Sequence, residues 1–124
     1  MRVGFSEREL DVMAVLWDRG PSTTAEVNAA LSDDLAYNTV LTVLRILEEK
    51  GHVGHVAEGR VHRYHALVDR EVAGASAAER IKDKMFGGSA ELLLTNFVDR
   101  QKLTTEEIRR LRKLLDERLK RGGR

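Results

Sequence analysis

Cysteine is absent from this sequence, proline occurs once, and only 5% of the residues are aromatic. Without cysteine the chain forms no disulfide, iron–sulfur cluster, thiolate metal site or cysteine nucleophile. The single proline excludes a proline-rich linker, and the few aromatic residues argue against a stacking platform for single-stranded nucleic acid. No apolar run approaches the roughly 20 residues of a membrane span, and the N-terminus lacks a signal-peptide core. We therefore expect a soluble, cytoplasmic protein without membrane insertion.

The length and the charge of the chain are those of a small globular protein. Its 124 residues allow one ordinary domain or two very small domains in tandem. The net charge of +1 is divided unevenly. Residues 1–68 hold 7 Lys and Arg against 10 Asp and Glu, which gives −3, and residues 69–124 hold 14 against 10, which gives +4. Charge alone therefore does not identify a nucleic-acid-binding protein.

Two capping boxes predict the first two helices. Ser6–Glu9 opens a helix with apolar residues at helical spacing as far as Trp17, and Gly20-Pro21 ends it. Thr23–Glu26 opens a second, short helix. The Ser32-Asp33-Asp34 segment that follows is expected to be a solvated turn that helps to cap the next helix, rather than a pair of catalytic carboxylates.

The third predicted helix, Tyr37–Lys50, has two chemically different faces. The apolar face is expected in the core and consists of Val40, Val43, Leu44 and Leu47. The opposite face carries Asn38, Leu41, Thr42 and Arg45. Asparagine can pair with adenine, arginine with guanine, and leucine or threonine methyl groups with the methyl group of thymine. This face therefore suits base reading, although the same residues also fit an ordinary solvated surface.

A β-hairpin is predicted directly after this helix. Two β-prone runs, His52–Ala57 and Arg60–Leu67, flank Glu58-Gly59, which reads as a tight turn. Three helices followed by a hairpin is the order of a winged helix-turn-helix domain. The wing tip would be Glu58–Arg60, so that Arg60 and Arg63 could reach phosphates beside the groove.

Four histidines lie within the 14 residues from His52 to His65. With Glu58-Gly59 as the turn, His55 would face His62 and His52 would face His65, on opposite faces of the ribbon. A four-histidine metal site is therefore disfavoured. One histidine pair with an outside ligand stays open as an alternative to a wing whose histidines contact phosphate or cover the sheet.

The second half of the chain is predicted to be entirely helical. Asp69, Ser89 and the Thr104–Glu107 capping box each open an amphipathic helix, and residues 121–124 are expected to be a disordered tail. Three helices of about 50 residues seldom build a sufficient core alone. We therefore interpret residues 69–120 as a homodimerisation domain, with folding back onto residues 1–68 as the alternative.

Five stretches together resemble the penicillinase-repressor family of transcriptional repressors (BlaI, MecI and CopY). These stretches are Glu9–Trp17, Tyr37–Leu44, Leu47–Gly51, Gly59–Tyr64 and Asn96–Val98. The resemblance covers about residues 5–118. It implies a winged-helix domain, a helical dimerisation domain, and a dimer on a palindromic operator that blocks transcription. For members that respond to β-lactam antibiotics it also implies release by a signal-activated protease between an Asn and a Phe, a dipeptide that falls here on Asn96-Phe97.

Three features qualify the resemblance. Family members often carry a polar or basic residue where this chain has Ile46, so base reading here would depend more on Arg45. The copper-responsive members sense metal through a C-terminal cysteine cluster, and the absence of cysteine excludes that mode. Phe97 is also explained as a core position of a dimer helix, whether or not the bond beside it is cut.

The expected protein is mainly α-helical with a small β-hairpin: a winged helix-turn-helix domain (1–68) followed by a helical dimerisation domain (69–120). The residues expected to contact double-stranded DNA are Tyr37, Asn38, Thr39, Thr42, Arg45, Arg60, His62 and Arg63. The residues expected in the dimer interface are Ile81, Met85, Leu93, Leu94, Phe97, Ile108, Leu111 and Leu115. No enzyme activity, cofactor or metal is expected, because no familiar catalytic or ligand spacing occurs. A winged-helix protein–protein module and a ligand-gated repressor stay open as alternatives.

Overall fold

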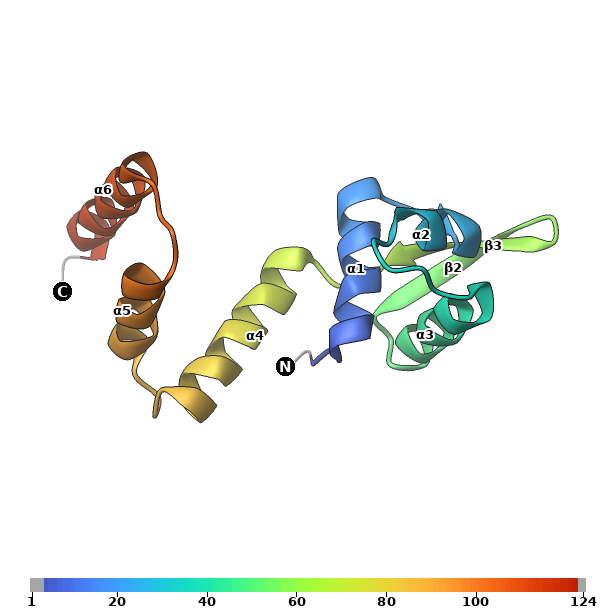
Figure 1. Ribbon diagram of the computed structural model, residues 1–124, viewed down its shortest axis with the longest axis horizontal. Coiled ribbons are helices and arrows are strands. Elements are labelled where there is room, and N and C mark those ends of the chain that lie inside the picture. The colour runs from blue at the N-terminus through green and yellow to red at the C-terminus, as the bar shows by residue number, and fades with distance from the viewer. Residues whose placement is uncertain (1–3, 123–124) are drawn as a thin grey trace. The chain divides into compact units, whose positions relative to one another are not determined.

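The computed structural model describes residues 4–122 and divides into two compact units, with the boundary between Arg80 and Ile81. Three helices and a three-stranded antiparallel sheet precede the last three helices (Figure 1). This arrangement confirms the expected fold class, a mainly helical chain that begins with a winged helix-turn-helix. Among the residues described, no helix is long and apolar enough to cross a membrane.

The first unit begins with the two helices that the capping boxes predict. Helix α1 spans Glu7–Arg19 with Ser6 as its N-cap, and helix α2 spans Thr24–Ala30 with Thr23 as its N-cap. In both boxes the cap side chain accepts a hydrogen bond from the N3 amide, and the N3 glutamate accepts one from the cap amide. Helix α3 spans Tyr37–Glu49, close to its predicted range.

The sheet consists of β2 (Val53–Glu58) and β3 (Val61–Ala66), which form the hairpin, and a short strand β1 (Ser22–Thr23) that pairs with β3. Strand β3 is therefore central, and the tip of the hairpin projects beyond the helices (Figure 1). Strand β1 is two residues long and was not predicted, since so short a segment has no visible alternation.

The predicted register of the hairpin is wrong by one residue in the turn. Ala57 pairs with His62 and Glu58 with Val61, so the central turn residues are Gly59 and Arg60 rather than Glu58 and Gly59. The backbone of Gly59 has a φ of +62°, which suits the first central position of a type II′ turn. A turn centred on Glu58-Gly59 would instead have favoured a positive φ at glutamate, at a cost in strain.

The core of the first unit joins all three helices to the hairpin. Apolar side chains that are fully or almost fully buried come from α1, α2, α3, β2 and β3, and they are Val12, Met13, Leu16, Val27, Val40, Leu44, Leu47, Val53 and Tyr64. The Nε1 of Trp17 donates a hydrogen bond to the carbonyl oxygen of Val68 at 2.9 Å. This bond ties the C-terminal half of α1 to the segment that follows the wing.

Helix α4 (Arg70–Met85) begins in the first unit, where Ala73 is buried and Arg70 lies over the Trp17 ring at 5.5 Å. The second unit contains α5 (Ala90–Arg100), capped by Ser89, and α6 (Thr105–Gly122), preceded by the expected capping box of Thr104. Arg121 and Gly122 belong to α6, so the helix ends later than expected. The rest of the expected tail, residues 123 and 124, lies outside the described residues.

Candidate nucleic-acid interface

Helix α3 presents an exposed face that carries five of the residues expected to contact DNA. Its opposite face is locked into the core by Val40, Leu44 and Leu47, which are fully buried. This burial fixes the rotation of the helix about its axis. The exposed residues are Tyr37, Asn38, Thr39, Thr42 and Arg45. Ile46 beside them is 39% exposed, so this surface also includes an apolar contact.

The polar groups on this face are largely uncommitted. The guanidinium of Arg45 and the side-chain amide of Asn38 make no hydrogen bond or ion pair with any of residues 4–122. The hydroxyl of Thr42 instead donates to the carbonyl oxygen of Asn38 at 2.8 Å. Thr42 therefore presents its methyl group and its hydroxyl lone pairs, while Asn38 and Arg45 keep their full donor and acceptor capacity.

An ion pair between distant parts of the sequence holds the C-terminal end of α3. The Nζ of Lys50 lies 2.8 Å from Oε2 of Glu9, and Oε1 of the same carboxylate accepts the Ser6 amide at 2.7 Å. Burial disfavours the charged carboxylate, but the hydrogen bonds from Lys50 and Ser6 outweigh it, so the pKa of Glu9 is lowered. The beginning of α1 and the end of α3 are thereby joined through one buried side chain.

Within the described part of the chain, no side chain caps the N-terminal end of α3. Its N-cap is Ala36, so the expectation that Ser32-Asp33-Asp34 helps to cap this helix is wrong. Asp33 instead pairs with Arg8 of α1 at 2.7 Å, which draws its carboxylate away from the helix end. Uncapped amides at a helix N-terminus are suited to an anion such as phosphate.

The wing carries one uncommitted cation at its tip. Arg60 is exposed, occupies the second central position of the turn, and makes no hydrogen bond or ion pair with the residues that the structure describes. His62 follows on β3, and its ring stacks on that of His55 with the centroids 4.0 Å apart and an angle of 8° between the planes. The Nδ1 of His55 lies 2.6 Å from Oε2 of Glu48 in α3. This stack therefore joins the wing to the C-terminal half of α3.

Histidines 55 and 62 meet as diagonal neighbours, because Tyr64 is the residue directly opposite His55. The prediction that they face each other is wrong in register, although the two rings do come together. His65 pairs with Gly54 on the other face of the ribbon, so the prediction that His65 faces His52 is wrong. Within residues 4–122, no group of three or more histidine or acidic side chains is arranged to hold a metal ion.

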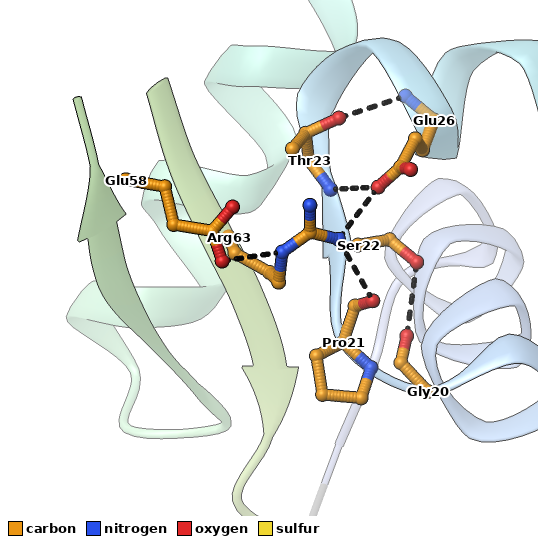
Figure 2. Close-up of polar contacts among 7 residues, drawn as sticks. All are labelled: Gly20, Pro21, Ser22, Thr23, Glu26, Glu58 and Arg63. Atoms are coloured by element: carbon orange, nitrogen blue, oxygen red, sulfur yellow. Dashed lines mark hydrogen bonds and ion pairs between the residues drawn. The ribbon is translucent and has the colours of Figure 1, made fainter. Parts of the chain in front are cut away.

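Arg63 was expected to reach phosphate, but its guanidinium is occupied within the unit. Its Nε donates to Oε2 of Glu58 at 2.8 Å, and its Nη1 donates to Oε1 of Glu26 at 2.9 Å (Figure 2). The hydrogen bonds to Glu58 and then Glu26 raise the pKa of Arg63. The hydrogen bond from Arg63 is the main cause of the lowered pKa of Glu58.

The second unit exposes the apolar side chains that were expected in a dimer interface. Within residues 90–100 and 105–122 no side chain is buried. Of the expected interface residues Leu93 is half-buried, and the exposed ones are Ile81, Met85, Leu94, Phe97, Ile108, Leu111 and Leu115. An apolar groove between α5 and α6 is lined by Val98, Ile108, Leu111 and Leu115.

The Asn96-Phe97 dipeptide lies inside α5, and both residues are exposed. Exposure gives a protease access to the side chains. The peptide bond itself is part of a continuous helix, so the helix must open locally before the bond can enter an extended active site.

Similarity to known proteins agrees with this geometry. The family described as penicillinase repressor matches residues 5–117. The chain belongs to this family. It is 31% identical to the penicillinase repressor of Bacillus licheniformis over 114 residues, covering 90% of this chain and 89% of that one. It is 37% identical to the transcriptional regulator BlaI of Mycobacterium tuberculosis over 120 residues, covering 94% of this chain and 84% of the relative.

Among solved structures, this penicillinase repressor family member is similar to the DNA-binding domain of the repressor BlaI. The TM-score is 0.50 at 35% sequence identity, and the match covers 56% of this chain and 90% of that domain. The relatives are transcriptional repressors, not enzymes, and this protein is a transcriptional regulator of the same kind.

Several residues that shape the interface of this repressor were not found from its sequence. Glu9 was recognised as part of a capping box but not as the partner of Lys50, 41 residues away. Glu26 was likewise recognised as a capping residue but not as a partner of Arg63. The pairing of β1 with β3, which brings Thr23 opposite Arg63, is the signal that would have revealed the second contact.

Proposed function

We propose that this transcriptional repressor is a homodimer that binds a palindromic DNA operator, with α3 in the major groove and the β2–β3 wing along the adjacent backbone. The observation that carries the proposal is the exposed face of α3, where the side chains of Asn38 and Arg45 make no hydrogen bond or ion pair with residues 4–122. The partly buried ion pair between Glu9 and Lys50 holds the C-terminal end of this helix, so its exposed face keeps a fixed orientation. The similarity to the DNA-binding domain of BlaI supports the same conclusion.

The residue types on this face are those that read base edges. Arginine forms two hydrogen bonds with the O6 and N7 of guanine, and asparagine forms two with the N6 and N7 of adenine. The methyl group of Thr42 and the half-exposed Ile46 offer apolar contact to a thymine methyl group. Arg60 at the wing tip and the uncapped N-terminus of α3 supply contacts to phosphate.

Selection of bound duplexes from a random pool tests this assignment. We expect an inverted repeat with half-site centres about 10 base pairs, or a multiple of that, apart. Replacing Arg45 with alanine is expected to weaken operator binding by about 1–3 kcal/mol and to relax selection at one base pair of each half-site. Arg19→Ala is the charge-matched control, because Arg19 at the end of α1 is exposed and has no hydrogen bond or ion pair with the residues that the structure describes.

Two results would contradict the assignment. An equal loss on operator and random DNA would show that Arg45 contacts phosphate only. Recovery of no preferred sequence, with affinity for DNA no higher than that of the Arg45→Ala variant, would favour a protein–protein module in place of a DNA-binding one.

The homodimer is supported by the uncovered apolar side chains of the second unit. Leu94, Phe97, Leu111 and Leu115 are each 42–58% exposed, and they lie on helices that bury no residue of their own. Exposed apolar area of this kind marks an interaction surface. The occupant we propose is a second copy of the same unit, because a symmetric operator requires two identical heads.

Sedimentation of the full-length chain tests the dimer. Leu94→Glu combined with Leu111→Glu is expected to yield a monomer that binds the full operator no better than a half-site. Leu67→Glu changes another exposed leucine, 59% exposed in the first unit, and is expected to leave the dimer intact. A wild-type chain that stays monomeric at micromolar concentration would contradict the proposal.

Dimerisation also explains how the repressor could be released from the operator. One head binds weakly, whereas two linked heads bind far more tightly through their effective concentration. Cleavage at Asn96-Phe97 by a signal-activated protease would remove α6 and part of α5, and so would separate the copies. Mass spectrometry of the repressor from induced cells is expected to find a fragment that begins at Phe97, and Asn96→Ala is expected to suppress it. Induction with the chain intact would favour a ligand-gated repressor.

A further inference from the structure

Arg63 occupies the middle of a polar cluster that joins the wing to the start of the helix-turn-helix. On one side its Nε contacts Glu58, the last residue of β2 before the turn. On the other side its Nη1 contacts Glu26 of α2 at 2.9 Å and the carbonyl oxygen of Pro21 at 3.4 Å. Figure 2 shows the guanidinium lying between these two groups of acceptors.

The backbone places Arg63 where it can make these contacts. Thr23 of β1 is paired with Arg63 of β3, and Thr23 is also the N-cap of α2. Oε1 of Glu26 accepts both the Thr23 amide and the Arg63 guanidinium, each at 2.9 Å. One carboxylate oxygen therefore serves the capping box of α2 and the central strand of the sheet at the same time.

The charge of the cluster disfavours a direct role with phosphate. One guanidinium and two carboxylates, all three exposed to some degree, leave one net negative charge beside the wing. A phosphate that approached Arg63 would meet Glu58 and Glu26 as well. Arg60, three residues earlier at the tip, has no carboxylate within ion-pair distance among the described residues.

We propose that Arg63 is a positioning residue: held in place by Glu58 of the wing, it binds Glu26 of α2 and so sets the angle of the wing against the helix-turn-helix, and it acts on DNA through Arg60. This inference rests on the proposed function, since it assigns different roles to two arginines of the same DNA interface. Arg60 neutralises a phosphate, and Arg63 determines where Arg60 can reach.

A charge-matched pair of substitutions separates the two roles. Glu58→Gln with Arg63→Gln removes the ion pairs and keeps the net charge of the cluster at −1, because only Glu26 remains charged. If Arg63 positions the wing, affinity for the operator falls about fivefold, and in an Arg60→Ala background the two substitutions change neither the affinity nor the salt dependence any further. If Arg63 itself contacts phosphate, the slope of log K against log salt becomes shallower by about 0.9 per head even in the Arg60→Ala background. Arg60→Ala, the matched control, is expected to show that shallower slope.

A double-mutant cycle gives the second readout. The loss caused by Glu58→Gln with Arg63→Gln is expected to disappear in an Arg60→Ala background, because the wing then has no cation left to position. A merely destabilising change would add to the loss at Arg60 instead. Additive losses, or a salt slope in the triple variant that is shallower than in Arg60→Ala alone, would overturn the inference.

A measurement without DNA keeps this test independent of the proposed function. Residual dipolar couplings of the full-length chain report the angle between wing amides and α3 amides. They are expected to change in the charge-matched variant and to stay the same in Arg60→Ala. Unchanged couplings in both variants refute the positioning role of Arg63. A wild-type chain with no affinity for any duplex refutes the proposed function and leaves the couplings to decide the role of Arg63.

Discussion

Replacing Glu9 tests whether one buried carboxylate joins the first and third helices of this repressor. The side chain of Glu9 is 7% exposed and accepts two hydrogen bonds, from the Ser6 amide at 2.7 Å and from Lys50 at 2.8 Å. Glu9→Ala removes both bonds and half of a capping box. Because Lys50 is 47% exposed and stays hydrated, the expected loss is about 2 kcal/mol of unfolding free energy at pH 7. Glu9→Gln keeps the acceptor for Ser6 and is expected to lose about half as much.

The lowered pKa of Glu9 predicts how the stability of the fold depends on pH. The pKa of Glu9 is lower in the folded chain than the value of about 4.3 that a glutamate has when unfolded. Its contribution to stability is therefore complete above the unfolded pKa and is lost as the pH falls through the folded pKa. The difference in stability between wild type and Glu9→Gln is expected to shrink from pH 6 towards pH 3.

The assay is urea unfolding followed by tryptophan fluorescence. Trp17 is the only tryptophan and lies in the first unit, on the same helix as Glu9, so the signal reports the unit of interest. Taking the difference between the two chains removes the titration of the other carboxylates, which both chains share. Equal stability of Glu9→Gln and wild type at pH 7, or parallel curves down to pH 3, would show that the charge of Glu9 does not stabilise the fold.

Three further predictions concern the core, the turn and the salt dependence. Leu44→Ala empties a fully buried site and is expected to cost about 2–5 kcal/mol by the same fluorescence assay; a loss below 1 kcal/mol would contradict the packing described. Gly59→Ala is expected to cost about 1 kcal/mol because φ is +62° there, whereas Gly74→Ala inside α4 is expected to stabilise slightly; equal effects would contradict the turn geometry. Operator binding titrated against salt is expected to give a slope of about −4 or shallower, since each head offers few free cations; a slope near −10 would contradict this.

Local signals in the sequence predicted most of the helices. Ser6, Thr23, Ser89 and Thr104 each cap the helix that was expected to follow them. A capping box involves residues only three apart, so the sequence contains the whole interaction. The stripe of Val40, Leu44 and Leu47 was likewise predictable, because helical spacing alone determines which residues share a face.

The register of the wing and the contacts of its side chains could not be predicted from local signals. The residues of the hairpin were identified, but its register depends on which residue takes the positive φ, and Gly59 can occupy either central position of a two-residue turn. The two carboxylates that bind Arg63 belong to residues 5 and 37 positions away in the sequence. No spacing pattern links these residues to Arg63. An arginine that faces a groove and an arginine that holds two glutamates look the same until the strands are paired. The base-contact and dimer residues stay predictions on the same grounds, since their partners are other molecules.

The apolar side chains that α5 and α6 leave open to solvent have a consequence for gene dosage. If pairing of two copies is what covers them, then at low expression the amount of paired repressor rises with the square of the number of chains synthesised. Operator occupancy would then respond steeply to transcription of the repressor's own gene, and halving expression would cost more than half of the repression.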